Sequence, residues 1–317
     1  MSSAIVERWV ARAAAATGRR GAILCFHGVT PVEEPRGSIH LAKDEFCTLL
    51  DALAATHRFL PVSELLKRLA AGHSTRGLIA VTFDDAYGSV ASLASPELEA
   101  RGIPHALFAV SGAARSGEAY WWDRLQSVER ALTPERWSAF EQAVRDHTGS
   151  SSLRDWVVHE HHGRWPASAL PALDQIEGEL GVTVTDRSVS LERLAALARN
   201  PLIEIGVHTV THPSLPTLSD ADITREVRQC YEELREVSAA TLPVLAAPYG
   251  LGDERVVRIS LASGMTAVLS VAGATLNPRA PAGWVPRVCL LAGMPIWKVG
   301  VTLAGWLDRR RLREPYA

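Results

Sequence analysis

The feature that most constrains the fold of this chain is the alternation of short apolar runs with longer amphipathic stretches. The apolar, β-prone runs lie near residues 22–26, 78–83, 105–110, 203–207, 243–246, 266–271 and 285–290. The helical stretches between them lie near residues 43–56, 63–71, 96–101, 219–239 and 253–263. Because strands and helices alternate in this way, we expect an α/β protein with a parallel sheet or barrel.

Two neighbouring carboxylates, Asp84 and Asp85, directly follow the apolar run 80–83. They therefore lie where a buried strand ends and a loop begins, which is the rim where such barrels build active sites. There, one carboxylate can bind a divalent metal while its neighbour takes a proton from a metal-bound water. An Asp-Asp pair alone is more often a turn or a helix cap, so the interpretation depends on the rest of the site.

A second strand-like run, 202–207, leads directly into His208, and His212 follows four residues later. If this loop makes a helical turn, both imidazoles share a face and reach one ion. Two histidines and one carboxylate leave an open coordination position. This arrangement suits Zn²⁺ with a bound water, although Co²⁺, Ni²⁺ or Fe²⁺ could occupy the same ligands.

Four short motifs resemble those of the polysaccharide deacetylases, the NodB-like carbohydrate esterases. Thr-Phe-Asp-Asp stands at 82–85, His-Thr-Val-Thr-His at 208–212 and Pro-Tyr-Gly at 248–250. The opening Tyr-His-x-Val signature of the family corresponds to Phe-His-Gly-Val at 26–29. The segment 120–125 is also similar to one common in deacetylases of bacterial surface-glycan pathways.

The resemblance covers about residues 22–290 and implies a deformed (β/α) barrel of the NodB-homology type with a helical insert. We predict a single deacetylase domain over 1–317, with a helical insert or lid at 113–200 and a C-terminal helix at 295–317. The insert is rich in tryptophan, which we interpret mainly as packing inside a small helical subdomain, with stacking on sugar rings as the alternative. Trp122 and Asp123 are the predicted exceptions, placed at the rim to bind substrate.

The resemblance also implies the roles of the two motif carboxylates. Asp85, His208 and His212 would bind one divalent metal, with Zn²⁺ as the first choice. The metal would polarise the carbonyl of an N-acetyl group on an amino sugar and lower the pKa of its water, while Asp84 removes the proton.

The third motif would hold the tetrahedral oxyanion that results from the attack. The backbone N–H of Tyr249 is the expected donor, because Pro248 and Gly250 fix the path of the turn. We also count Pro248 among the residues that contact the substrate.

The chain departs from the common family pattern at two places. Many members carry an arginine before the proline of the third motif, where this chain has Ala246 and Ala247. We expect Arg287 to supply the missing cation, because a guanidinium can pair bidentately with Asp84. Many members also take the general acid from a histidine in a late Leu-x-His motif, whereas this chain has no histidine after residue 212. In rearranged members the early Tyr-His motif fills that role, so the resemblance implies that His27 protonates the leaving amine.

Composition excludes several other classes of function. A net charge of −2 over 317 residues argues against nucleic acid, which normally requires a basic surface. The four cysteines, at 25, 47, 230 and 289, have no metal-ligand or disulfide spacing, and we interpret them as reduced core thiols. Residues 1–16 are interpreted as an amphipathic helix, not a signal peptide, and no stretch of about 18 apolar residues exists. These features predict a cytoplasmic protein.

The substrate is less constrained than the reaction. A cytoplasmic enzyme of this kind would act on an N-acylated amino sugar carried by a nucleotide, a lipid or a growing glycan. The segment 295–313 combines apolar residues with four terminal arginines and could contact an anionic membrane, although a helix packed on the barrel is the favoured interpretation. Two alternatives stay open, namely a deformylase acting on a lipid-linked formamido sugar and a non-catalytic glycan-binding barrel.

Overall fold

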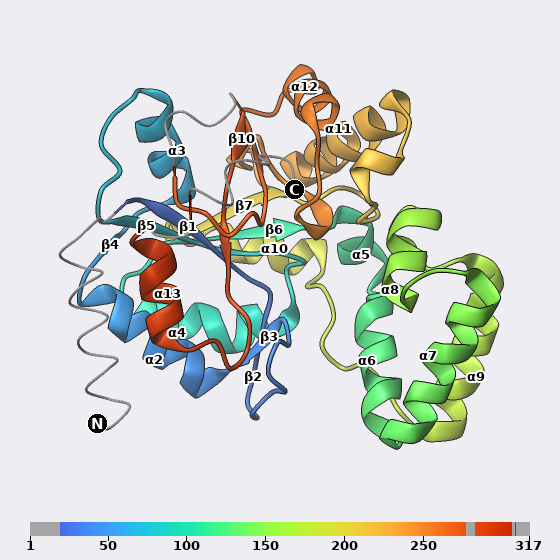
Figure 1. The fold of residues 1–317 in the computed structure, drawn as a ribbon. Coiled ribbons are helices and arrows are strands. Elements are labelled where there is room, and N and C mark those ends of the chain that lie inside the picture. The colour runs from blue at the N-terminus through green and yellow to red at the C-terminus, as the bar shows by residue number, and fades with distance from the viewer. Residues whose placement is uncertain (1–19, 277–282, 306–307, 309–317) are drawn as a thin grey trace, which may run out of the picture.

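The computed structural model describes residues 20–276, 283–305 and 308, and its strands form one curled, parallel sheet surrounded by helices (Figure 1). The main sheet has nine strands in the order β10-β9-β8-β7-β6-β5-β1-β11, with β4 paired to β5. Every pair in it is parallel. The expected α/β barrel is thereby confirmed, whereas the helix predicted at residues 1–16 lies outside the described part of the chain.

The strands of the main sheet follow the predicted apolar runs, except for one short strand at 58–59 that was not predicted. Those of the main sheet are β1 (Ala22–Phe26), β4 (Arg58–Phe59), β5 (Leu78–Phe83), β6 (His105–Ala109), β7 (Ile203–Val207), β8 (Val244–Ala246), β9 (Ala267–Leu269), β10 (Trp284–Val285) and β11 (Val288–Cys289). Two short strands, β2 (Gly28–Thr30) and β3 (His40–Ala42), pair with each other.

The single strand expected at 285–290 is wrong, because the structure divides it at Pro286 and Arg287. Pro286 has no N–H to donate to a strand ladder, so regular pairing stops there. As a result β10 pairs with β9 at one edge of the sheet, while β11 pairs with β1 at the other. Arg287 therefore lies where the chain passes between the two edges of the curled sheet.

Helices follow most strands, as expected for a parallel sheet. The barrel helices are α2 (Lys43–Ala54), α3 (Val62–Ala70), α4 (Ser95–Ala100), α5 (Ser111–Ser116), α10 (Leu191–Leu197), α11 (Asp220–Val237), α12 (Glu254–Ala262) and α13 (Ile296–Leu303). Several begin at side-chain caps, such as Ser219, whose hydroxyl accepts a hydrogen bond from the N–H of Asp222 at the start of α11.

The sheet has two apolar faces, and alternate residues of each strand belong to different cores. In β5, Ile79, Val81 and Phe83 pack in the larger core with the surrounding helices. The intervening Ala80 belongs to a second core, which gathers apolar side chains of several strands and of α3. Side chains on the same face of β5 as Ala80 therefore point to the interior of the curled sheet.

Helices α6 (Trp121–Ala131), α7 (Pro134–Thr148) and α9 (Leu170–Leu180) stand together at one side of the sheet, together with the short α8 (Leu153–Asp155) (Figure 1). They enclose a small core of their own, and most of the tryptophans of this segment are partly buried and pack against it: Trp121, Trp137, Trp156 and Trp165. The preferred interpretation of these tryptophans as packing residues agrees with this core. Whether the segment acts as a lid stays a prediction.

The C-terminal helix α13 packs on the barrel. Val299 and Leu303 are buried in the larger core, and a small apolar hollow separates the helix from α2. The opposite face of α13 leaves Trp297 with 44% of its surface exposed. No helix in the described residues is both long and apolar enough to cross a membrane.

Candidate functional site

Interior-facing positions of three adjacent strands bring the polar residues together. Cys25 of β1 is opposite Thr82 of β5 on one side and Cys289 of β11 on the other. Because alternate strand residues share a face, His27 and Asp84 continue the rows of Cys25 and Thr82 to the C-terminal ends of their strands. The main motifs therefore meet at the rim of the sheet, although they are far apart in the sequence.

Asp85, His208 and His212 form a compact, buried cluster that could hold a metal ion. Their ligand atoms lie within 4.8 Å of one another. Asp85 Oδ1 is 3.4 Å from His208 Nε2 and 3.6 Å from His212 Nε2, and it has no hydrogen-bond partner among the described residues. A buried carboxylate oxygen without a partner is costly, and a bound cation would remove that cost.

The two imidazoles of this cluster are prepared as metal ligands. His208 Nδ1 lies 2.8 Å from the carbonyl oxygen of Ala246, to which it can donate, and this leaves the Nε2 lone pair toward Asp85. Burial lowers the pKa of His212 to about 3, so its ring stays neutral. Since metals bind the neutral form of histidine, the donor set fits a divalent ion such as Zn²⁺.

Asp84 forms a bidentate ion pair with Arg287. Nη1 and Nη2 of Arg287 donate to the two carboxylate oxygens at 2.7 Å each, and Nη1 also reaches the hydroxyl of Thr82 at 3.2 Å. Burial alone raises the pKa of Asp84, but the Arg287 guanidinium outweighs it and holds that pKa well below its usual range. Asp84 is therefore an ionised carboxylate, the form needed to accept a proton.

His27 lies beside Cys289 and faces the same cavity as Asp84. Burial by itself lowers the pKa of His27, but its interaction with Cys289 and the negative charges of Cys289, Asp85 and Asp84 together raise that pKa to about 9. In this environment the imidazole carries a proton at neutral pH. That is the state in which it can act as a general acid.

The loops of the site are held in an unusual backbone conformation. Among the described residues, six non-glycine residues have positive φ. Four of them belong to the sequence motifs: Asp85 (66°), Thr209 (69°), His212 (56°) and Tyr249 (59°). The left-handed region costs a residue with a Cβ about 1 kcal/mol or more, and such residues cluster at functional sites. This concentration of strain marks the three loops as one site.

Tyr249 lies between Pro248 and Gly250 in a tight turn. The turn is closed by hydrogen bonds from Gly250 N–H to Ala247 and from Leu251 N–H to Pro248. The phenol of Tyr249 donates to the carbonyl oxygen of Gly163 at 2.6 Å, and its ring lies 4.6 Å from that of His212. Pro248 is buried, so its contribution is the path of the backbone. Its predicted contact with substrate stays a prediction.

Trp122 stands against His212, with ring centroids 4.7 Å apart. Behind it lies a hydrogen-bonded row, in which the Trp122 indole donates to the Tyr87 hydroxyl at 2.8 Å, and Tyr87 donates to Asp123 Oδ2 at 2.6 Å. The other carboxylate oxygen of Asp123 is 3.1 Å from His40 Nε2. Asp123 is thus buried with both carboxylate oxygens hydrogen-bonded, and it also lines the cavity that contains Asp84. Its predicted contact with substrate stays a prediction.

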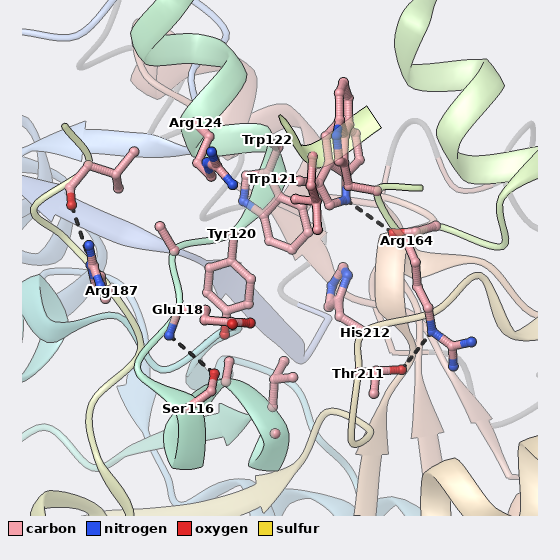
Figure 2. Close-up of a pocket in the computed structure, with 18 of the residues that line it drawn as sticks. Ser116, Glu118, Tyr120, Trp121, Trp122, Arg124, Arg164, Arg187, Thr211 and His212 are labelled. Carbon is pink, nitrogen blue, oxygen red and sulfur yellow. Dashed lines mark hydrogen bonds between the residues drawn. The ribbon is translucent and has the colours of Figure 1, made fainter. Parts of the chain in front are cut away.

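Two cavities meet at this tryptophan. A cavity of about 550 Å³ is lined by the candidate catalytic residues, including His27, Asp84, Asp85, His208, His212 and Tyr249. A second cavity, of about 820 Å³, shares Trp121, Trp122 and His212 with the first. Figure 2 shows the second cavity, with the stacked rings of Tyr120 and Trp122 and the edge of His212 between flanking arginines. The site therefore continues beyond the metal-binding cluster.

Sequence reasoning missed two residues of the site, Cys25 and Cys289. Both are free thiols in the structure, and their sulfur atoms lie within 4.8 Å of a ring nitrogen of His27. The sequence offers one signal for them. Cys25 lies two residues before His27, and Cys289 lies two residues after Arg287. Residues two apart in a strand lie on the same face of the sheet. The pairing of β1 with β11 could not be predicted from that spacing.

Comparisons with known proteins agree with this geometry. Residues 71–268 match the family model described as polysaccharide deacetylase. The fold is similar to that of IcaB from Ammonifex degensii, with a TM-score of 0.58, 20% identity and coverage of 92% of this chain and 97% of that one. It is also similar to the Streptococcus pyogenes deacetylase PplD, solved in complex with acetate, with a TM-score of 0.56, 15% identity and coverage of 90% and 99%. From the matched residues, which make up more than half of its length, the chain belongs to the polysaccharide deacetylase family.

Proposed function

We propose that this protein is a metal-dependent deacetylase that removes the N-acetyl group from an amino sugar of a glycan or glycan precursor. The observation that carries the proposal is the arrangement around one cavity of the Asp84 carboxylate paired with Arg287, the His27 imidazole and a buried Asp-His-His cluster. These are a base, an acid and a metal site, which together make up a metal-assisted hydrolase.

The proposed reaction forms a bond between a water oxygen and the acyl carbon and breaks the bond from that carbon to nitrogen. Asp84, kept ionised by Arg287, takes a proton from the attacking water. His27 gives a proton to the departing nitrogen, so that acetate and a free amine leave. Tyr249 would donate its backbone N–H to the oxyanion. A divalent cation held by Asp85, His208 and His212 would supply polarisation of the acyl carbonyl and a lower pKa of the water.

The aromatic wall supports a sugar as the substrate. Trp122 presents a ring next to the metal-binding cluster, and aromatic faces of this kind suit the apolar faces of sugar rings. Because a second cavity lies directly on the other side of this wall, we infer that the substrate extends beyond a single sugar. A glycan or a carrier-linked sugar fulfils that requirement.

We further propose a place in a bacterial surface-glycan or glycoconjugate pathway, with the enzyme acting in the cytoplasm before export. The four cysteines, which are all thiols in the structure, support a reducing compartment. Contact with an anionic membrane through residues 295–313 would bring the enzyme to lipid-linked substrates. Exposed Trp297 on α13 supports this idea.

The decisive experiment measures products from candidate substrates with the wild-type chain and Asp84→Asn. N-acetylated sugar nucleotides, lipid-linked sugars and short oligosaccharides would each be assayed for released acetate and formate. Acetate release that is lost in Asp84→Asn supports the deacetylase. Formate in place of acetate would identify a deformylase, and glycan binding without either product would contradict catalysis.

A further inference from the structure

Cys25, His27 and Cys289 form a second cluster of potential metal ligands, distinct from Asp85, His208 and His212. Strands β1 and β11 are neighbours in register, with Cys25 opposite Cys289, and His27 is two residues along from Cys25 on the same face. One ligand atom of each residue lies within 4.8 Å of the others. A tetrahedral zinc site with bonds of about 2.0–2.3 Å has edges of roughly 3.3–3.8 Å, so small side-chain rotations bring these atoms into place.

The environment of the cluster also suits an ion. His27 Nδ1 is buried and has no hydrogen-bond partner among the described residues. Cys25 is fully buried, whereas His27 and Cys289 line the catalytic cavity, which gives an ion a path from solvent. Two thiolates and a neutral imidazole cancel the charge of a divalent ion, which limits the cost of placing it in the interior. The Asp84 carboxylate lies 3.4 Å from Cys25 Sγ, and the Arg287 guanidinium that pairs with it offsets its negative charge.

We propose that Cys25, His27 and Cys289 bind a second, thiophilic divalent ion such as Zn²⁺, and that this ion inhibits the enzyme by occupying His27. Binding releases two protons, one from the thiol of Cys25 and one shared by the hydrogen-bonded pair of His27 and Cys289, and the sulfur and nitrogen atoms then donate their lone pairs to the ion. A set of two cysteines and one histidine leaves a fourth position open to the cavity. The inhibition rests on the proposed role of His27 as general acid, whereas the binding site itself does not.

Cobalt titration of the full chain tests the site directly. The protein is reduced, stripped of metal with a chelator and titrated with Co²⁺, and thiolate-to-cobalt charge-transfer absorption is recorded. Because Asp85, His208 and His212 contain no sulfur, only the second cluster produces this absorption. We expect two bound equivalents in the wild type, of which one gives the thiolate band.

Four variants assign the band. Cys289→Ser and Cys25→Ser should each lose it, whereas Cys47→Ser, at a half-buried cysteine of α2 outside the cluster, should keep it. Asp85→Ala should lose the other equivalent and retain the band. Absence of the band in the wild type, or its persistence in Cys289→Ser, would overturn the proposal. Oxidation of the two cluster thiols to a disulfide in place of metal binding would also overturn it.

Activity gives a separate readout. Once Zn²⁺ saturates the thiolate site, deacetylation by the wild type and Cys47→Ser should fall roughly 100-fold, the typical contribution of a general acid. Cys289→Ser should show no such fall relative to its own activity. If the band forms but no substrate is ever deacetylated, the proposed function fails and the site stands. If deacetylation is normal and no band forms, only the second site fails.

Discussion

At the scale of single residues, Asp84 and Asp85 are neighbours with different partners. Asp84 faces a guanidinium, and Asp85 faces two imidazoles. The different partners follow from the turn of the backbone at Asp85, whose φ is 66°. A positive φ at this point directs consecutive side chains to different sides of the rim.

This division predicts separable losses in two isosteric variants. Asp84→Asn should lower kcat about 10²–10⁴-fold while the metal content stays unchanged, because only the proton acceptor is removed. Asp85→Asn should lose bound metal together with activity. Metal analysis and acetate release on the same preparations measure both effects. Equal metal loss in the two variants would contradict the assignment.

Arg287 is buried completely, and its pairing with Asp84 has a consequence for stability. Arg287→Met leaves a buried carboxylate without its partner, which should lower the free energy of unfolding by about 3–5 kcal/mol. The loss should be much smaller in the Asp84→Asn background, because no charge is then left unpaired. Urea unfolding of the four proteins in this cycle measures the coupling. Additive losses of unfolding free energy in the double variant would show that the two side chains are not coupled. An unchanged rate of deacetylation in Arg287→Met would show that Arg287 does not keep Asp84 active as proposed.

At the scale of elements, β6 carries a titratable group inside the sheet. His105 is fully buried, with Nε2 2.9 Å from the hydroxyl of Ser95, and burial lowers its pKa to about 4. The unfolded chain, in which this pKa is about 6.5, binds the proton more readily. The stabilisation from the neutral ring is therefore complete above pH 6.5 and is lost as the pH falls toward 4.

The expected effect of His105 is about 3 kcal/mol of stability lost between pH 6.5 and 4. His105→Gln keeps a polar atom near Ser95 but cannot titrate, so its unfolding free energy should fall less over the same range. Urea unfolding at several pH values compares the two proteins, and the difference between them isolates His105 from other groups. Identical pH dependence would contradict the assignment.

The boundaries of the strands also show which features of the fold can be predicted from short stretches of sequence. The apolar runs that became β1, β5, β6 and β7 were predicted because each is short, apolar and bounded by turn residues. The last run was misjudged at Pro286, where a missing N–H divides the strand between opposite edges of the sheet. Its apolar pattern is continuous, so periodicity alone does not reveal the division.

At the scale of the whole molecule, the C-terminal helix bears on the proposed contact with a membrane. Helix α13 is anchored in the barrel core by Val299 and Leu303 and exposes Trp297 on its outer face. The arginines that follow, at 309, 310, 311 and 313, lie outside the described residues. If this end of the chain binds anionic lipid, each arginine near the surface contributes roughly 1 kcal/mol.

The corresponding prediction concerns flotation with vesicles that contain anionic lipid. Replacing Arg310 and Arg311 by Gln should weaken binding by about 2 kcal/mol, or roughly 30-fold. Replacing Arg225 and Arg228, two exposed arginines of α11, should have little effect and serves as the matched control. Binding that is absent in the wild type, or equal in both double variants, would end the membrane proposal.

The sequence by itself determined the class of fold and the residues of the main motifs, because both depend on local patterns. Strand and helix periodicities are encoded over a few residues, and the motif side chains follow directly from strand ends. Only the tertiary structure decided which distant groups meet. The pairing of Asp84 with Arg287 was expected from the departure from the family pattern, whereas the approach of Cys289 to Cys25 and His27 was not. Both depend on the order of strands in the sheet. That order is set by the packing of all the strands and helices together, and no local spacing records it.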